Sequence, residues 1–525
     1  MGLYLNLGNE GFASAKRSDY VDKTSTIVFM NEVLNTEKRY VCVTRARRFG
    51  KSMAAKMLCA YYDQSCGSRS LFEGLQVARH PSFEQHLNKY PVIYLDMTGF
   101  TTRYHGDDNM VAHVQRELSE ELLEDYPQVE VKETDDLLNV LSRIVESTKQ
   151  KFIFIIDEWD AVCREAEGNE RLMDGYVNML RRLFKGANSG QIFAGVYMTG
   201  ILPIKKYNTQ SALNNFLQFS MVSPGPLATS FGFTEKEVQR LCREKGRDFD
   251  ELKQWYDGYS IGTEKGIFNP NSVMMAFLNG SCENYWSSTR AFDNVSRYIQ
   301  MNYEGLKDDI IRMVAGGRCA VNTTRFENDL STIRSKDDVL TALIHLGYLA
   351  YDGDKEECFI PNREVAQEMQ NAVEDAHWDV VINAIKQSEL LLERTLAEDE
   401  AAVVQAVDAI HADNTSILQY NDENSLACVL TLAYYAAKKD YKWVRELPTG
   451  LGFADIVLLP NRNVDKPAIV LELKYDNSAE TAITQIHEKR YADSLLDYVG
   501  KIVLVGINYD KKTKCHTCRI ETVVK

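Results

Sequence analysis

Three continuous apolar runs in the first part of the chain predict buried strands of one parallel sheet. They are Tyr40–Thr44, Lys151–Asp157 and Ile192–Met198. A strand covered on both faces is apolar at nearly every position, whereas a half-exposed strand alternates. Each run leads into polar residues, and parallel strands bring such ends together at one edge of the sheet. The pattern therefore predicts an α/β core over residues 1–230.

Helical patterns dominate the middle of the chain. Thr234, followed three positions later by Glu237, has the spacing of a capping box and predicts the start of a helical lid that extends to about residue 300. Residues 335–347 are amphipathic and end at Gly347, and two short β-like runs around Gly353 follow. A helix before a hairpin indicates a winged-helix-like element. Residues 231–400 are thus expected to hold the lid, this element and an acidic helical connector.

Residues 405–525 show a further alternation of helical and strand patterns. Helices are predicted over Asn424–Ala437 and Ala479–Leu496, and strands at Gly452–Pro460, Ile469–Lys474 and Lys501–Ile507. The second of these strands ends in Glu-Leu-Lys, and Asp455 lies near the start of the first. This region is expected to be a second, separate α/β domain.

The segment after the first strand has the chemistry of a phosphate-binding loop. Gly50-Lys51-Ser52 opens a predicted helix, where backbone N–H groups and the helix N-terminus attract phosphates. We expect Lys51 to reach the β- and γ-phosphates of ATP and the Ser52 hydroxyl to bind Mg²⁺. The preceding residues Arg47-Arg48-Phe49 complete the predicted nucleotide-binding loop.

Arg45 occupies the position of the first glycine in the general phosphate-loop pattern, so this loop should follow a different path. The ends of the next two strands strengthen the assignment. Asp157 is expected to bind Mg²⁺, Glu158 to polarise the attacking water, and Thr199 to sense the γ-phosphate. Core strands with polar ends are the alternative, but the order of these motifs along the chain favours an ATPase.

The second candidate site combines carboxylates with a lysine. Glu472 and Lys474 lie two positions apart, so they share one face of a strand. Together, Asp455 and Glu472 can bind a hard cation such as Mg²⁺ or Mn²⁺ through oxygen ligands. Lys474 can position a water nucleophile, Glu423 can add a carboxylate, and Gln485 can orient Lys474 or contact a nucleic-acid backbone. Glu-Leu-Lys also occurs on ordinary helix surfaces, and the surrounding strand pattern argues against that reading.

These motifs resemble two known families. The C-terminal Asp455…Glu472-x-Lys474 pattern is similar to the PD-(D/E)xK, restriction-endonuclease-like nucleases. The rest of the chain resembles the bacterial AAA-ATPase-like family, in which an RxRRFGK[ST] loop lacks the first glycine. The segments that carry the second resemblance are Tyr20–Thr24, Thr44–Ser52, Asp157–Asp160, Thr199–Pro203, Phe231–Glu235, Trp255–Tyr259 and Asn269–Val273.

The resemblance implies a P-loop ATPase core joined to a nuclease-like domain, with ATP and Mg²⁺ as cofactors and DNA or RNA as a partner. Two positions depart from the pattern, since Ala46 stands where proline is usual and Trp159 where tyrosine is usual. Neither departure removes a phosphate or metal ligand.

Charge is distributed unevenly along the chain. The formal net charge is −15, but residues 361–425 contain three Lys/Arg against fourteen Asp/Glu. Residues 441–525 contain thirteen Lys/Arg against eleven Asp/Glu, and residues 1–60 contain ten against five. Local basic groups govern contact with phosphates, so the acidic total does not exclude nucleic acid.

Composition narrows the compartment and the class of protein. No run approaches the ~20 apolar residues of a membrane span, and the first residues lack a signal-peptide pattern. The eleven cysteines are scattered, which predicts reduced thiols in a cytoplasmic protein; Cys515 and Cys518 are expected on an edge strand. The leading hypothesis is an ATP-controlled nuclease. The alternative is a nucleotide-switched signalling or scaffold ATPase whose C-terminal domain binds a partner without cleaving; a homo-oligomer stays open in either case.

Overall fold

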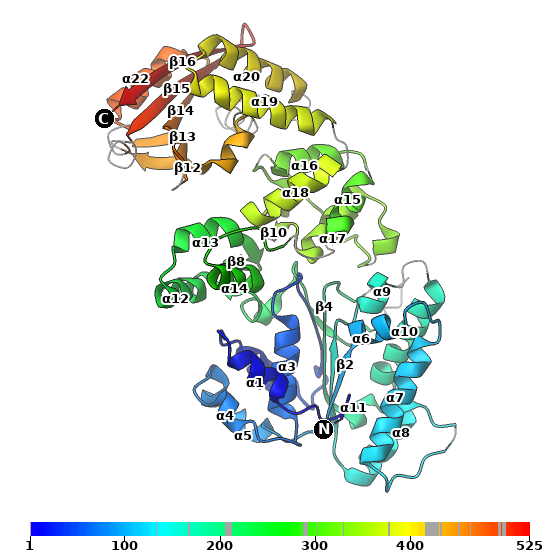
Figure 1. Cartoon of the computed structure of the whole chain (residues 1–525). Helices are drawn as coiled ribbons and strands as arrows, with labels where there is room; N and C mark the ends of the chain where they lie inside the picture. Colours follow the sequence, from blue (N-terminus) through cyan, green and yellow to red (C-terminus); the bar gives the residue numbers. More distant parts are fainter. Residues whose placement is uncertain are drawn as a thin grey trace. The chain divides into compact units, whose positions relative to one another are not determined.

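The computed structural model of the chain comprises two compact units (Figure 1). The first contains Met1–Phe292 and Ala320–Glu368, and the second Asp293–Cys319 and Met369–Lys525. The structure describes residues 2–132, 134–165, 169–204, 213–286, 292–301, 303–314, 316–328, 330–375, 379–414, 430, 433–449, 452–461, 464–491, 495 and 500–524. The division of the chain into residues 1–230, 231–400 and 405–525 stays a prediction.

A parallel sheet forms the centre of the first unit, with strand order β2-β3-β4-β1-β5. Every residue of β1, β3 and β4 is buried, as their continuous apolar runs predict. Because the strands are parallel, Thr44, Asp157 and Gly200 end at the same edge. The predicted α/β core is confirmed. The strands are β1 (Tyr40–Thr44), β2 (Val92–Asp96), β3 (Phe152–Asp157), β4 (Phe193–Gly200) and β5 (Leu217–Phe219).

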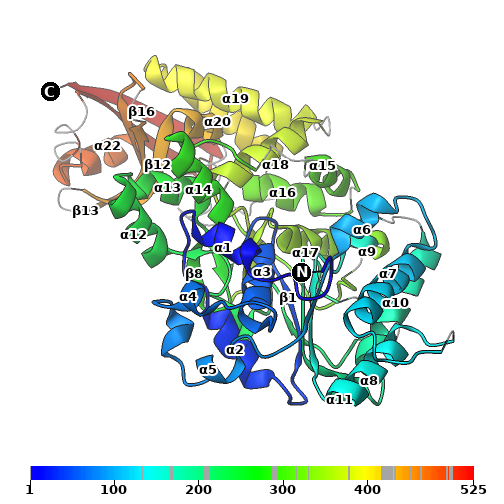
Figure 2. The ribbon, with the colours of Figure 1, turned by 60° about the horizontal axis from the view of Figure 1, so that its bottom comes forward.

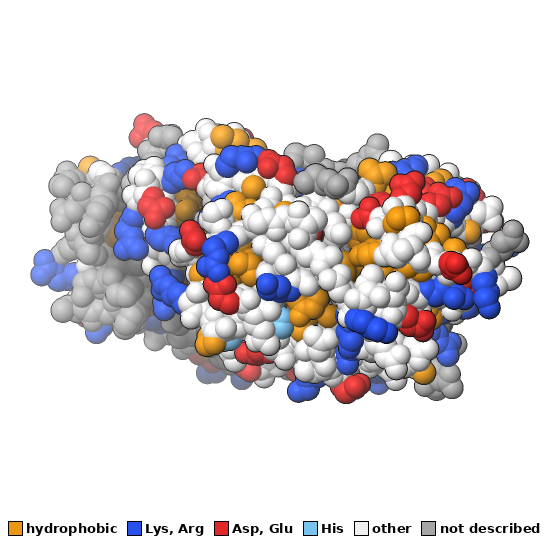
Figure 3. Space-filling view, turned by 90° about the horizontal axis from the view of Figure 1, so that it is seen from below, with side chains coloured by type: hydrophobic (Ala, Val, Ile, Leu, Met, Phe, Trp, Pro, Cys, Tyr) orange, Lys and Arg blue, Asp and Glu red, His pale blue; other side chains and the backbone are white. Residues whose placement is uncertain are grey.

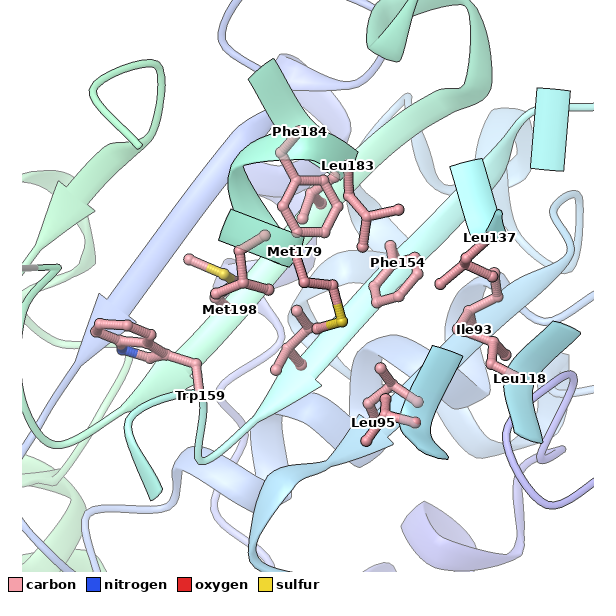
Figure 4. Packing of buried hydrophobic residues seen from close by; sticks show 14 of the residues in the cluster. Ile93, Leu95, Leu118, Leu137, Phe154, Trp159, Met179, Leu183, Phe184 and Met198 are labelled. Carbon is pink, nitrogen blue, oxygen red and sulfur yellow. The ribbon is translucent and has the colours of Figure 1, made fainter. Parts of the chain in front are cut away.

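Helices cover both faces of this sheet, which is why its strands show no alternation (Figures 1 and 2). On one face Val41, Val43 and Ile155 pack with α3 (Lys51–Tyr62) and α2 (Ser25–Val33). On the other face Phe154 and Met198 pack with α7 (Met110–Asp125), α8 (Leu137–Thr148) and α10 (Glu170–Lys185). Figure 4 shows this second core, with Trp159 and Met198 near one end and Phe154, Leu183 and Phe184 along it.

The predicted lid begins at a capping box. The Thr234 hydroxyl accepts the N–H of Glu237, and the Glu237 carboxylate accepts the N–H of Thr234. The elements here are β6 (Phe233–Thr234), α12 (Glu235–Lys245), α13 (Phe249–Tyr256), β7 (Tyr259–Ile261), β8 (Glu264–Phe268) and α14 (Pro270–Asn279). The later helix and hairpin are present as α17 (Lys336–Leu346), β10 (Ala350–Asp352) and β11 (Glu357–Phe359).

The second unit contains a mixed sheet of order β12-β13-β14-β15-β16. Only the β14–β15 pair is parallel among these described pairings, and α22 packs its Ile483 and Ile486 against Val470 and Leu504. Cys515 and Cys518 lie on β16, at the edge, as predicted. The elements are β12 (Tyr441–Thr449), β13 (Gly452–Pro460), β14 (Ala468–Tyr475), α22 (Ala479–Glu488), β15 (Lys501–Asp510) and β16 (Cys515–Val524).

One helix prediction in this unit is wrong in its extent. The helix predicted over Ala479–Leu496 ends at Glu488. Arg490 has a left-handed backbone (φ 57°), and Tyr491 N donates to the carbonyl of Ile486 at 3.1 Å. A left-handed residue ends a helix by satisfying its last carbonyls, and a sequence without glycine there does not reveal it.

The acidic connector is helical, as expected, with α18 (Arg363–Asp375), α19 (Asp379–Leu396) and α20 (Glu400–Asn414). Most of the predicted helix Asn424–Ala437, with Glu423, lies outside the described residues. None of the described helices combines the length and apolar character that a membrane crossing requires. Further helices are α1 (Glu10–Lys16), α4 (Arg69–Phe72), α5 (Phe83–His86), α6 (Met97–Arg103), α9 (Ala161–Glu165), α11 (Ser189–Ile192), α15 (Phe292–Gln300) and α16 (Leu306–Val314).

Candidate functional site

The Gly-Lys-Ser turn lies where β1 passes into α3. Gly50 caps the helix with a left-handed backbone (φ 88°), a conformation that glycine adopts without steric cost. The Lys51 side chain is buried and donates to the carbonyl of Ala46 at 3.1 Å. Ser52 is hydrogen-bonded to Asp157. The turn therefore places an ammonium group, a hydroxyl and a carboxylate together at the edge of the sheet.

Arg45 has a structural position beside this turn. Its side chain is fully buried, and the guanidinium donates to the carbonyls of Thr44 (2.9 Å), Phe219 (2.9 Å) and Leu227 (3.0 Å). Burial lowers the pKa of Arg45 to about 10. The residue that replaces the usual glycine thus holds the segment after β5 against the start of the loop.

The other residues of the predicted nucleotide loop have different surroundings from one another. Arg48 donates to the carbonyl of Tyr285, and burial lowers its pKa. Phe49 is buried edge-on against Tyr259, with ring centroids 5.1 Å apart. Arg47 is half-buried. Arg48 and Phe49 line the cavity described below, and Arg47 is not among the described residues that do so.

Asp157 and Glu158 follow β3 directly. Tyr94 donates its hydroxyl proton to Asp157 Oδ2 at 3.0 Å, and the N–H of Glu158 donates to Asp157 Oδ1 at 3.0 Å. Burial raises the pKa of Asp157, while the hydrogen bond from Ser52 acts in the opposite direction. Glu158 has a left-handed backbone (φ 49°), and its Oε1 lies 3.7 Å from Lys51 Nζ. The structure therefore brings Lys51, Ser52, Asp157 and Glu158 together.

Thr199 lies at the end of β4, fully buried and paired with Val43 of β1. Its carbonyl accepts the N–H of Trp159 at 2.9 Å, and the Trp159 indole N–H donates to the carbonyl of Leu202 at 3.1 Å. Gly200 permits this contact, because a Cβ there would lie 2.3 Å from Asp160 Oδ1. The ends of β3 and β4 are therefore locked together.

A cavity of about 760 Å³ extends from this turn toward the lid. Gly50, Lys51, Ser52 and Glu158 line it at the turn, and its other charged or amide side chains are Asp19, Lys23, Arg48, Lys245 and Asn271. Its apolar part is lined by Val21, Met53, Met57, Phe231, Phe233, Met274, Met275 and Phe277. Small-molecule sites are commonly largely apolar with a few polar groups that orient the ligand, and their volumes are about 300–1,000 Å³. A phosphate-binding turn in a cavity with many apolar side chains suits a ligand that joins phosphates to a flat ring.

The second candidate site is formed by β13, β14 and α22. Ile456 pairs with Leu471, so the next step of the register sets Asp455 beside Glu472. Asp455 Oδ2 accepts the N–H of Leu473 at 2.8 Å. Glu472 Oε1 accepts from Lys474 Nζ at 3.2 Å and from the Gln485 amide. Asp455, Glu472, Lys474 and Gln485 therefore meet, with Gln485 bonded to Glu472 rather than to Lys474.

Glu472 has the properties of a cation ligand. It is 1% exposed, and its Oε2 is buried without a hydrogen-bond partner among the described residues. Burial, followed by the Asp455 carboxylate, raises the pKa of Glu472 to about 7. A positive ion between the two carboxylates would relieve both effects. Within the described ranges no group of three or more His, Cys, Asp or Glu could hold a metal, and Glu423 lies outside them.

Tyr491 is buried and hydrogen-bonded to Gln485, which helps to hold the amide against Glu472. Two residues beside Glu158 were given no role from the sequence. Asp160 and Arg164 flank Glu158 and form an ion pair at 2.9 Å. Their spacing of four residues is the signal that an ion-pair search along a helix would have used.

Family models match two parts of the chain. Residues 8–209 match the family model described as predicted AAA-ATPase, and residues 421–518 match the PD-(D/E)XK nuclease superfamily. An uncharacterized protein in the vnfD 5′ region of Azotobacter chroococcum mcd 1 is 23% identical over 543 residues, covering 97% of each chain.

Among solved structures, two of the Aeropyrum pernix ORC2 protein align with 71% of this chain and 99% of theirs at 10% identity. They are the ADPNP-ADP complexes, with a TM-score of 0.33, and the ADP form, with 0.26. Likeness at this level supports no inference. The family matches do: the chain carries an AAA-ATPase-like domain followed by a PD-(D/E)XK nuclease-like domain.

Proposed function

We propose that this protein binds and hydrolyses ATP and that the ATP-bound state controls metal-dependent phosphodiester cleavage by the C-terminal domain. The observation that carries the ATPase part is that Lys51, Ser52 and Glu158 line one cavity together with many apolar side chains, and that Asp157 adjoins Glu158. The triphosphate would lie at Lys51 and Ser52, and the base among the apolar side chains.

Each residue of the nucleotide site has a separate task in this proposal. Lys51 binds the terminal phosphates, and the backbone N–H groups after Gly50 bind phosphate oxygens. Ser52 and Asp157 would hold Mg²⁺, which neutralises phosphate charge when bound. Glu158 accepts a proton from the attacking water, while Thr199 reports the state of the γ-phosphate through the locked ends of β3 and β4.

The cleavage part rests on the geometry around Glu472. Asp455 and Glu472 would hold Mg²⁺ or Mn²⁺, which polarises a phosphodiester and lowers the pKa of bound water. Lys474 lies against Glu472 and is placed to orient the nucleophile or stabilise charge on the phosphate. Gln485 keeps the Glu472 carboxylate in one orientation.

The charge of the surface is not the basis for proposing nucleic acid as a partner. Where Figure 3 colours the side chains, Lys and Arg are interspersed with Asp and Glu. The nucleic-acid partner, DNA or RNA, is therefore proposed from the Asp455–Glu472–Lys474 geometry.

A second function is favoured by one observation. Among the described residues the C-terminal site offers only two carboxylates, one of them with a pKa raised to about 7. If these carboxylates contact a partner and bind no metal, the protein is a nucleotide-switched signalling or scaffold ATPase.

The two functions are separated by a cleavage screen with purified protein. Plasmid, linear DNA, single-stranded DNA and RNA are incubated with Mg²⁺ or Mn²⁺, with and without ATP. Cleavage that disappears in Asp455→Ala and depends on nucleotide supports the controlled nuclease. If every substrate stays intact while ATP is hydrolysed, the scaffold function is retained and the nuclease is rejected.

A further inference from the structure

Arg164 pairs with two carboxylates: Asp160, which holds the arginine in place, and Glu158, which is the proposed base. Its Nε lies 2.9 Å from Asp160 Oδ2, and one terminal nitrogen lies 2.6 Å from Glu158 Oε2. The Arg164 side chain is 13% exposed. Burial acts to lower the pKa of Arg164, but the carboxylates of Asp160 and Glu158 outweigh it and raise that pKa. The guanidinium is thus a fixed cation at the back of Glu158.

Asp160 holds this arginine in place. It is fully buried, and its carboxylate also accepts the N–H groups of Ile201 at 3.1 Å and Leu202 at 3.0 Å. A buried carboxylate with several donors is expensive to move, because each lost hydrogen bond would leave a desolvated charge. Arg164 is therefore anchored at one nitrogen to the rigid end of the sheet and offers another to Glu158.

Glu158 needs such support. It lies on a turn between β3 and α9, and 22% of its side chain is exposed. A free glutamate has several rotamers, whereas Glu158 is held with Oε2 against Arg164 and Oε1 facing Lys51 at 3.7 Å. That orientation points one oxygen toward Lys51, and both residues line the cavity.

We propose that Arg164 is a positioning residue for ATP hydrolysis, which holds the Glu158 carboxylate directed at the attacking water. This inference rests on the proposed ATPase function. The guanidinium touches Glu158, and Arg164 is not among the described residues that line the cavity, so its effect passes through that carboxylate. It also ties Glu158 to the Ile201–Leu202 segment beyond Thr199.

The test is a double-mutant cycle on the full chain with Glu158→Gln and Arg164→Gln, measured as steady-state ATP hydrolysis and as ATP affinity by calorimetry. Arg164→Gln is expected to lower kcat by roughly 10- to 100-fold, the scale of a misplaced catalytic group, and to leave ATP affinity nearly unchanged. In the Glu158→Gln background the same change should have little further effect.

The split between kcat and ATP affinity is the second readout, because a change that only disturbed the fold would lower both. Arg182→Gln is the matched control, since Arg182 also pairs with a carboxylate, Asp136, but is 64% exposed on α10. It should change neither kcat nor ATP affinity.

The outcomes separate the two proposals. Equal losses of kcat from Arg164→Gln with and without Glu158 would show that Arg164 does not act through Glu158 and would overturn the inference. Full activity of Glu158→Gln would reject the proposed ATPase mechanism itself. If circular dichroism shows that Arg164→Gln does not fold, Arg164→Lys replaces it in the same cycle; it keeps a charge but cannot span both carboxylates, so a coupled loss is again expected.

Discussion

The Lys51 ammonium lies 3.7 Å from Glu158 Oε1, so the cation that should bind phosphates faces the carboxylate that should activate water. Both groups line the same cavity. When a nucleotide enters, its terminal phosphates would lie between them. Their two roles differ, and this difference can be tested by separate substitutions.

Lys51→Ala should abolish tight ATP binding, because it removes the buried ammonium aimed at the terminal phosphates. Glu158→Gln should retain binding and lower the hydrolysis rate by roughly 10²- to 10⁴-fold, as expected for loss of a general base. Titration calorimetry and phosphate release measure the two effects. Lys56→Ala, an exposed change on the same helix, is the control and should alter neither. Unchanged affinity in Lys51→Ala would refute the phosphate-loop assignment.

In the C-terminal site, substitution of a carboxylate and substitution of the lysine should affect Mn²⁺ binding differently. Asp455→Ala and Glu472→Ala should weaken Mn²⁺ binding and remove cleavage, whereas Lys474→Ala should remove cleavage but retain Mn²⁺, since an ammonium is no metal ligand. Mn²⁺ affinity by calorimetry and cleavage of the substrate found in the screen are the measurements. ATP hydrolysis should persist in all three variants.

The exposed Asp465→Ala, in the connection between β13 and β14, is the matched control for the loss of a carboxylate in the same domain. It should retain Mn²⁺ binding and cleavage. Cleavage that persists in Asp455→Ala would point to another site or to a contaminating nuclease, and equal loss of Mn²⁺ in Lys474→Ala would contradict the assigned roles.

The sequence predicted those features of the structure that depend on residues close together in the chain. β1, β3 and β4 are apolar at nearly every position because both faces are covered, and Glu472 and Lys474 meet because a strand repeats every two residues. The contacts of Arg45 with Phe219 and Leu227 join residues far apart in the chain. The periodicity of a sequence does not encode contacts between distant residues. The sequence therefore predicted that the loop follows a different path, but it did not reveal the contacts that are the cause.

The difference between local patterns and contacts of distant residues also applies around Glu158. Its neighbour Arg164 lies only six residues away, but the Asp160 carboxylate that anchors Arg164 is itself held by Ile201 and Leu202 on another strand connection. Helix ends are a second kind of feature that the sequence does not reveal. The end of α22 depends on a left-handed arginine, a conformation that residue type alone does not favour.

Arg45→Gly, which restores the glycine of the general phosphate-loop pattern, should destabilise the protein. The change leaves the buried carbonyls of Phe219 and Leu227 without their donor, and each such hydrogen bond from a charged group contributes about 1.5–3 kcal/mol. The measurement is the urea midpoint of the first unit's unfolding transition. Arg45→Lys, with one point charge for several carbonyls, should be intermediate. Wild-type stability in Arg45→Gly would show that Arg45 is not the element that holds this segment.

Burial of Glu364 predicts a pH-dependent stability. Glu364 is fully buried, accepts from Ser272 Oγ (2.9 Å) and Tyr285 N (2.8 Å), and has its pKa raised from 4.5 to about 7 chiefly by burial. The folded protein therefore binds this proton more tightly than the unfolded chain. The stabilisation is complete below about pH 4.5 and is lost as pH rises through about 7. At about 1.4 kcal/mol per pKa unit, the change is on the order of 3 kcal/mol.

Glu364→Gln replaces the carboxyl group by a neutral amide of the same shape and should remove this dependence. The difference in unfolding midpoint between variant and wild type is measured at about pH 5 and about pH 8, which cancels the titration of every other group. The variant should gain relative to wild type as pH rises. Glu283→Gln, an exposed change on the neighbouring segment, should show no such trend. A midpoint difference for Glu364→Gln that is the same at both pH values would mean that Glu364 titrates as an ordinary carboxyl group in the folded protein.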